Sequence, residues 1–139
     1  MSEIKTCSRC GVSKSIETFA PRTDNKPHKQ YFRGVCRECH NLRTREHWKR
    51  IRETIFNHYG WKCECCGETI KEFLSLDHKD NDGYLDKNPN GSKKSGKELY
   101  LLVIKQGLPD KYQTLCMNCN WAKKVCGTCP HKSNSKTNG

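Results

Sequence analysis

Residues 112–124 read YQTLCMNCNWAKK, a run in which a strand pattern, a pair of cysteines and a helix pattern follow one another directly. The first four residues, 112–115, favour a strand, and we expect a helix over residues 118–124. Cys116 and Cys119 lie at the junction, and their C-x-x-C spacing lets two thiolates from one tight turn reach one tetrahedral zinc ion. The run therefore predicts a small zinc-stabilised fold of the α+β class.

The other cysteines repeat this spacing. The chain holds 11 cysteines, and all but Cys65 fall into C-x-x-C pairs. Disulfides would explain them in a secreted chain, but in a reducing compartment repeated pairs favour metal ligands, so we expect structural zinc, about two ions per chain. The predicted ligand sets are Cys7/Cys10/Cys36/Cys39 and Cys63/Cys66/Cys116/Cys119. Whether Cys126, Cys129 and His131 bind a third zinc stays open, with His47, His28 or Cys65 as possible fourth ligands and a free buried thiol as the alternative for these cysteines.

Composition points to a polyanionic partner. The chain has 139 residues and a formal net charge of +11, with 33% hydrophobic and 29% charged residues. So little apolar material makes one large core improbable, and such an excess of basic side chains favours nucleic acid, or less often an anionic membrane surface. The sequence has no apolar span of membrane-crossing length and no signal-peptide core, so we expect a cytoplasmic protein without a membrane partner.

Four segments are expected along the chain. Residues 1–40 favour a zinc-ribbon-like module, residues 41–60 a basic linking helix with an apolar stripe, residues 61–131 a second module, and residues 132–139 a disordered tail. The helix surface is either a solvated linker face or a phosphate-tracking face, and its charge favours the second. The predicted nucleic-acid contacts on this helix are Arg43, Arg45, Lys49, Arg50 and Arg52.

One group of polar residues is typical of chemistry. Asp77 and His78 end a predicted strand over residues 73–78, and Asn120 directly follows Cys119. Four thiolates on one zinc ion would draw that strand end towards the helix that carries Asn120. A zinc ion with four sulfur ligands has no open position, so chemistry would need a second, oxygen-liganded metal.

The order C-x-x-C, then Leu76-Asp77-His78, then L-C-x-x-C-N-x-x-K resembles the HNH endonucleases of the ββα-metal fold, and most of all small phage-encoded members and the recombination endonuclease VII group. The resemblance covers residues 55–131, and residues 1–40 are similar, more weakly, to zinc ribbons that precede such domains. It implies a ββα-metal nuclease core, preceded here by the zinc ribbon and the basic helix, and a DNA endonuclease that hydrolyses phosphodiester bonds. A phage-encoded member would work in the host cytoplasm.

The resemblance also implies roles for single residues. His78 would be the general base, and Asp77 and Asn120 would hold a catalytic Mg²⁺ or Mn²⁺ ion. Lys123 would bind the scissile phosphate. Neighbouring strand residues point to opposite faces, so Asp77 and His78 would need a local twist or bulge to serve one site. One departure from the family pattern is Lys111, which stands where an asparagine that supports the loop is usual.

A second function stays open beside the nuclease. A non-catalytic zinc-finger protein that binds DNA or RNA would share the cysteines and the basic charge, with Asp77-His78 incidental. The expected partner in the nuclease case is duplex or branched DNA, and a double-strand break would need a dimer or two visits, because one site cuts one strand. The target, the biological role and the oligomeric state do not follow from the sequence.

Overall fold

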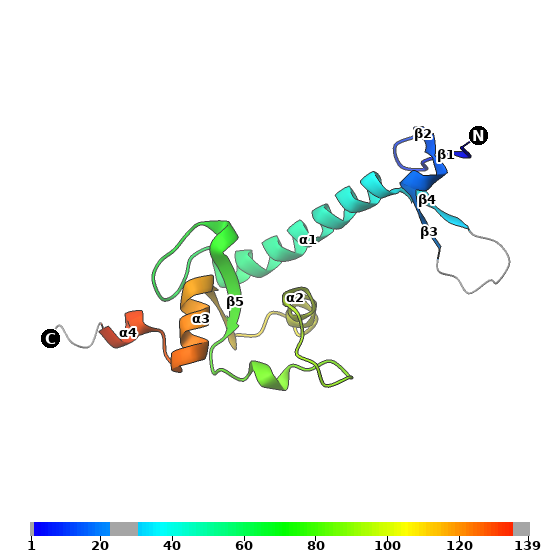
Figure 1. The fold of residues 1–139 in the computed structure, drawn as a ribbon. Helices are drawn as coiled ribbons and strands as arrows, with labels where there is room; N and C mark the ends of the chain where they lie inside the picture. The colour runs from blue at the N-terminus through cyan, green and yellow to red at the C-terminus, as the bar shows by residue number, and fades with distance from the viewer. Residues whose placement is uncertain (1, 23–30, 135–139) are drawn as a thin grey trace. The chain divides into compact units, whose positions relative to one another are not determined.

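A computed structural model describes residues 2–22 and 31–134, and the chain divides into two compact units, Met1–Lys49 and Arg50–Gly139 (Figure 1). Helix α1 (Arg37–Tyr59) begins in the first unit and ends in the second. In the described residues, none of the helices combines the length and the apolar character that crossing a membrane requires. Each unit is small, with sheets of only two strands, so cysteine clusters carry much of what a larger core would otherwise provide.

The first unit contains two antiparallel hairpins and the start of α1. Its elements are β1 (Ile4–Thr6), β2 (Ser13–Ser15), the 3-10 turn η1 (Ile16–Thr18), β3 (Phe19–Pro21) and β4 (Phe32–Cys36). Strand β1 pairs with β2, and β3 pairs with β4 with a shift of register between Phe19 and Pro21. Among the described residues of this unit, the buried core consists of Phe19, Cys7 and Cys36, a core to which a zinc ion at the cysteines would add much.

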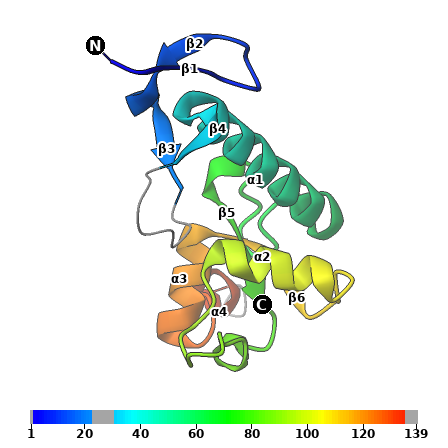
Figure 2. The ribbon, with the colours of Figure 1, turned by 90° about the vertical axis from the view of Figure 1, so that its right-hand side faces the viewer.

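The second unit is built around a two-stranded sheet and a helix that follows it directly. Its elements are the end of α1, η2 (Lys71–Phe73), β5 (Leu74–His78), η3 (Gly83–Leu85), α2 (Gly96–Lys105), β6 (Tyr112–Cys116), α3 (Met117–Cys126) and α4 (Pro130–Asn134). Strands β5 and β6 are antiparallel and in regular register from Leu74↔Cys116 to His78↔Tyr112. Figure 2 shows this unit with α3 beside the strands. Its core joins the apolar side of α1 to the sheet through Ile55, Phe56, Leu74 and Leu115.

The two units share one local design. In each, a C-x-x-C-G turn comes first, a 3-10 turn leads into a strand, and a second strand ends on a cysteine from which a helix starts. Gly11 and Gly67 close the turns with φ of 69° and 80°, conformations that glycine adopts without strain. Each donates its N–H to the main-chain oxygen of the first cysteine of its turn, at 2.9 and 3.0 Å. The residue after the first cysteine of each turn donates its N–H to a main-chain oxygen of the strand that ends on a cysteine. Ser8 donates to Gly34 and Glu64 donates to Thr114, both at 2.9 Å.

The predicted elements are found with shifted ends. The strands expected over residues 73–78 and 112–115 correspond to β5 and β6, and the helix expected after Cys116 is α3. The helix expected from residue 41 instead starts at Arg37, because it grows directly from the cysteine that ends β4. Residues 132–134 of the expected tail belong to α4. Residues 135–139 lie outside the described residues.

Candidate functional site

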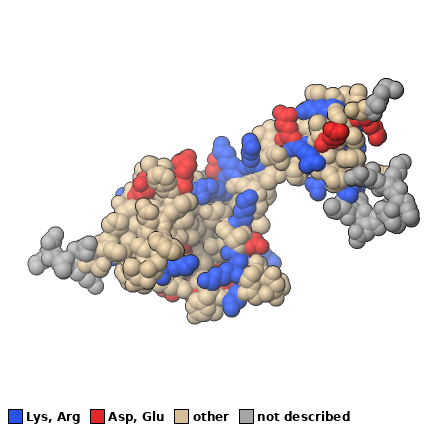
Figure 3. All heavy atoms as spheres, in the orientation of Figure 1, with Lys and Arg blue, Asp and Glu red and all other residues tan. Residues whose placement is uncertain are grey.

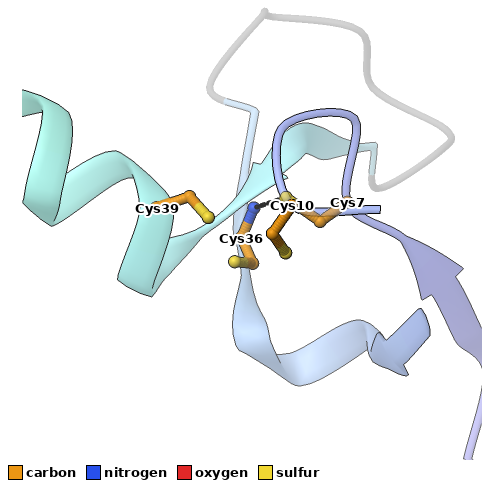
Figure 4. Close-up of side chains that lie close together, drawn as sticks. All are labelled: Cys7, Cys10, Cys36 and Cys39. Carbon is orange, nitrogen blue, oxygen red and sulfur yellow. Dashed lines mark hydrogen bonds between the residues drawn. The ribbon is translucent and has the colours of Figure 1, made fainter. Parts of the chain in front are cut away.

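The cysteines of the first unit converge on one point. Cys7 and Cys10 come from the turn between β1 and β2, Cys36 ends β4, and Cys39 lies in the first turn of α1 (Figure 4). Their four Sγ atoms lie within 4.8 Å of one another, which fits a tetrahedral zinc ion. Backbone N–H groups of Cys10 and Cys36 lower the pKa of the Cys7 thiol to about 6, and the thiolate form is the one that binds metal.

The second unit repeats this cluster with Cys63, Cys66, Cys116 and Cys119, whose sulfur atoms also lie within 4.8 Å of one another. Cys116 caps α3, because its Sγ accepts the N–H of Cys119 at 3.4 Å. Burial opposes ionisation of Cys63, but N–H groups of Cys66 and Cys116 outweigh it and lower the pKa to about 7. All eleven cysteines are free thiols, so both predicted four-cysteine sets could hold structural zinc.

A third set combines Cys65, Cys119, Cys129 and His131, and it shares Cys119 with the second. Of the fourth ligands considered for the C-terminal cysteines, Cys65 is the one that joins them. Cys126 is exposed and belongs to none of the sets in the described residues. His47 lies in α1 with its ring against Trp48, and His28 lies outside the described residues.

Asp77 faces helix α3. Its Oδ2 accepts hydrogen bonds from Lys123 Nζ at 2.6 Å and from Gln113 Nε2, on the paired strand, at 2.9 Å. The Lys123 ammonium also donates to the main-chain oxygens of His78 and Lys79, at 2.5 and 3.2 Å. The side chains of Asp77 and Lys123 keep only 11% and 12% of their exposure, so this is a largely desolvated ion pair at the end of β5.

Asn120 lies one helical turn before Lys123, on the same side of α3. Its Nδ2 donates to Ser75 Oγ at 2.9 Å, and that hydroxyl in turn donates to the main-chain oxygen of Leu115 at 3.0 Å. Ser75 and Asp77 are alternate residues of β5 and therefore share one face of the sheet. The structure thus brings the amide of Asn120 and the carboxylate of Asp77 to one face, with the amide held through its nitrogen.

His78 lies on the opposite face of the strand from Asp77. Its Nε2 lies 2.6 Å from Oδ2 of Asp86, and the same carboxylate oxygen accepts the hydroxyl of Tyr112 at 3.1 Å. Burial opposes ionisation of Asp86, but these two partners and Lys111 outweigh it and keep its pKa below the usual range. The other edge of the ring packs against Gly83, where an added Cβ would lie 2.9 Å from Nδ1. His78 is thus oriented by a carboxylate on one side and a glycine on the other.

Both faces reach one cleft because β5 ends at His78. A cleft of about 420 Å³ is lined by the candidate residues Asp77, His78, Asn120 and Lys123 and by basic residues that include Lys93, Lys94 and Lys124. No bulge lies between Asp77 and His78, since the register of β5 and β6 is regular to the last pair. Asp77 and His78 can both line the cleft because β5 ends there, and side chains of both faces of the strand border the same space.

A catalytic cation would find one carboxylate and one amide in this cleft. In the described part of the chain, the sets of three or more Cys, His, Asp or Glu ligands are the cysteine-based ones, so no all-protein cage for Mg²⁺ is formed there. Mg²⁺ often binds through one or two carboxylates together with water and substrate phosphate, so Asp77 and Asn120 fit such an ion. The Lys123 ammonium now neutralises Asp77, and a cation bound there would have to compete with it.

Three residues that hold the candidates in place carry no sequence motif of their own. Asp86, Gln113 and Ser75 contact His78, Asp77 and Asn120 respectively. Gln113 could have been found from strand pairing, because it stands opposite Asp77 once Leu74 is aligned with Cys116. Asp86 gives no such signal, since it lies in a polar loop that also contains Asp80 and Asp82, and the sequence does not distinguish among the three.

The basic face of α1 is exposed except at one position. Arg43, Arg45, Lys49 and Arg50 are exposed. Arg52 is half-buried: it donates to the hydroxyl of Tyr100 at 3.2 Å and to main-chain oxygens of Lys71 and Leu74, and its guanidinium stacks 4.5 Å from the ring centre of Phe56. Arg52 therefore has a structural role in the second unit. Figure 3 shows basic side chains along α1 and on the second unit.

Comparisons with known proteins add no relative: no family model, no curated protein and no solved structure matches this chain.

Proposed function

We propose that the second unit is a divalent-metal-dependent endonuclease that hydrolyses phosphodiester bonds in DNA. The observation that carries the proposal is the cleft at the end of β5, in which a carboxylate, an oriented imidazole and an amide meet beside several lysines. A polyanionic substrate fits a chain with a formal net charge of +11. The strand, strand and helix order of β5, β6 and α3 supports the proposal, because it matches the order expected of the ββα-metal fold.

The imidazole of His78 takes a proton from the attacking water. Asp86 accepts a hydrogen bond from Nε2 and so orients the ring, and Nδ1, beside Gly83, which has no side chain, is the nitrogen that would accept the proton. Tyr112 and Lys111 hold Asp86 in turn, the hydroxyl at 3.1 Å and the ammonium 4.0 Å from the other carboxylate oxygen. Lys111, the departure from the family pattern, thus supports the loop with a charge instead of an amide.

Asp77 and Asn120 would hold a Mg²⁺ or Mn²⁺ ion, which when bound would stabilise the charge on the phosphate and on the departing oxygen. Gln113 and Ser75 fix the two ligand side chains, each through one hydrogen bond. Lys123 then turns from Asp77 to the phosphate, and Lys93, Lys94 and Lys124 on the cleft wall neutralise the flanking backbone.

A non-catalytic zinc-finger binder of nucleic acid is the second candidate. The Asp77–Lys123 ion pair favours it, because a carboxylate that is permanently neutralised by a lysine is a poor metal ligand. The basic cleft would then hold a phosphate without cleaving it.

Plasmid nicking separates the two functions. The full-length protein, isolated with its zinc, is expected to nick supercoiled plasmid with Mg²⁺ or Mn²⁺ and to stop when the divalent ion is withheld. His78→Ala should lower the rate by about 10²–10⁴-fold while DNA binding is kept, because a general base contributes that much. Binding without any divalent-dependent nicking, or a His78→Ala variant as fast as the wild type, would select the binder.

A further inference from the structure

One buried sulfur in the second unit belongs to two ligand sets. Cys119 lies with Cys63, Cys66 and Cys116 in one set and with Cys65, Cys129 and His131 in another, and within each set all ligand atoms lie within 4.8 Å of one another. Cys119 is fully buried at the start of α3. Both sets are therefore formed at once, around a common atom.

The distances in the set with His131 match a tetrahedral metal site. For Zn–S bonds of about 2.3 Å and Zn–N bonds of about 2.0–2.1 Å, ligand atoms in a tetrahedron are about 3.5–3.8 Å apart. His131 Nδ1 lies 3.4 Å from Cys119 Sγ, 3.4 Å from Cys129 Sγ and 4.0 Å from Cys65 Sγ. In the neighbouring set, Cys66 Sγ and Cys116 Sγ are 3.6 Å apart. The second set thus has a spacing close to that of the first, with one imidazole nitrogen in place of a sulfur.

The ligand count distinguishes one ion from two. The two sets together contain seven side chains, Cys63, Cys65, Cys66, Cys116, Cys119, Cys129 and His131. A single four-coordinate zinc would leave three of them without metal, including the buried Cys129. Two four-coordinate ions use all seven if one thiolate binds both.

We propose that the second unit holds a dinuclear zinc centre in which the Cys119 thiolate bridges the two ions. One ion has Cys63, Cys66 and Cys116 as its other ligands, and the second has Cys65, Cys129 and His131. The second ion ties α4 and the turn after α3 to the cysteine turn that holds Cys65. This zinc centre does not depend on the proposed nuclease activity.

The second ion would also stiffen a wall of the cleft. Gly127 ends α3 and accepts a hydrogen bond from Asn81 Nδ2 at 3.4 Å, and both residues line the cleft that holds Asp77 and His78. Cys129 lies two residues beyond Gly127. A metal on Cys129 thus limits the movement of the segment against which the loop after His78 rests.

The first unit has no counterpart to the second ion among its described residues. Arg9 stands in its turn where Cys65 stands in the second, and the Arg9 guanidinium donates to the main-chain oxygen of Cys39 and to Glu46, both at 3.3 Å. The first unit therefore has one four-cysteine set and a guanidinium contact in place of a fifth sulfur.

Cadmium NMR on the full-length protein tests the bridge directly. With ¹¹³Cd in place of zinc, the proposal predicts two resonances that couple to each other through the Cys119 sulfur, and a third, uncoupled resonance from the first unit. Uncoupled resonances throughout, or a single resonance from the second unit, would overturn it. This readout needs no substitution and so does not depend on a variant that folds.

Native mass spectrometry of variants tests the ligands of the second ion. The wild-type chain is expected to hold one zinc ion more than Cys65→Ser and His131→Ala, because both changes leave the four-cysteine sets intact. Cys126→Ser is the matched control, since this exposed cysteine belongs to no set, and it should keep the wild-type number. A Cys65→Ser variant with the wild-type zinc count contradicts the proposal. Neither experiment measures nicking. A failure of the nuclease proposal would therefore change neither expected result.

Discussion

The first and second units contain the same turn, strands and helix start. They differ in the polar side chains that the first strand of the pair and the helix carry. Phe19 and Leu74 are both buried opposite the cysteine that ends the paired strand. Counted from these residues, Asp77 of the second unit corresponds to Arg22 of the first. Counted from Cys116 and Cys36, Asn120 corresponds to His40.

The comparison distinguishes the residues that stabilise each unit from the residues proposed for the chemistry. The cysteines and the buried strand residue recur, and both units have small apolar cores that structural zinc ions at these cysteines would reinforce. The pair of proposed oxygen ligands belongs to the second unit, where Ser75 and Gln113 hold Asn120 and Asp77 in place. In the first unit Arg22 takes the place of the aspartate, and the positive charge of an arginine would repel a divalent cation. We infer that the first unit has a structural or DNA-binding role.

The largest expected effect comes from removing the strand-end cysteine of either unit. Cys116→Ser should unfold the second unit and abolish nicking, because a structural zinc contributes about 10–16 kcal/mol to the folding of such small domains and serine is a poor replacement ligand. Cys36→Ser should unfold the first unit but leave nicking at the rate of the wild type when DNA is saturating. Zinc content, amide NMR spectra and nicking rates measure this. Equal loss of nicking in both variants would show that the two units are not separable in function.

Removing the carboxylate that orients His78 should have the next largest effect. Asp86→Asn is expected to slow nicking at least about tenfold, because the imidazole loses the partner that keeps Nδ1 free to accept a proton. High Mn²⁺ should not restore the rate, since the defect does not lie in metal binding. Asp110→Asn is the control: this carboxylate is fully exposed and pairs only with Lys79 at the surface, where an ion pair contributes little. Equal rates for both variants would remove Asp86 from the mechanism.

The smallest expected effect concerns the basic helix. Replacing Arg43, Arg45 and Arg50 with glutamine should weaken binding to unrelated DNA sequences alike and lower the slope of log affinity against log salt by about 2–3, because each phosphate contact contributes about 0.9. Arg52 is left in place because its change would disturb the contacts with Tyr100 and Phe56. Filter binding at several salt concentrations measures the slope. An unchanged slope would assign phosphate binding to other basic residues.

Local pattern predicted most of the second unit, and long-range contacts account for what it missed. The strands, the helix after Cys116 and the two four-cysteine sets follow from spacing and periodicity within short segments. Spacing left Cys65 as one of three possible fourth ligands, because Cys129 and His131 lie more than 60 residues away and become its neighbours only when the turn and α4 meet at Cys119. Asp86 was missed for the same reason: it reaches His78 through a loop whose path depends on packing and not on pattern.

Comparing Asn120→Ala with His40→Ala tests the central claim most directly, because the two residues occupy the same place in the two units, four positions after the strand-end cysteine. Nicking of supercoiled plasmid would be measured over a range of Mn²⁺ concentrations, together with Mn²⁺ binding to the full-length protein. The account predicts that Asn120→Ala loses nicking at low Mn²⁺, recovers part of it at high Mn²⁺ and binds the ion more weakly, whereas His40→Ala behaves as the wild type. Loss of nicking in His40→Ala, or wild-type nicking and Mn²⁺ binding in Asn120→Ala, would contradict the assignment of the chemistry to the second unit.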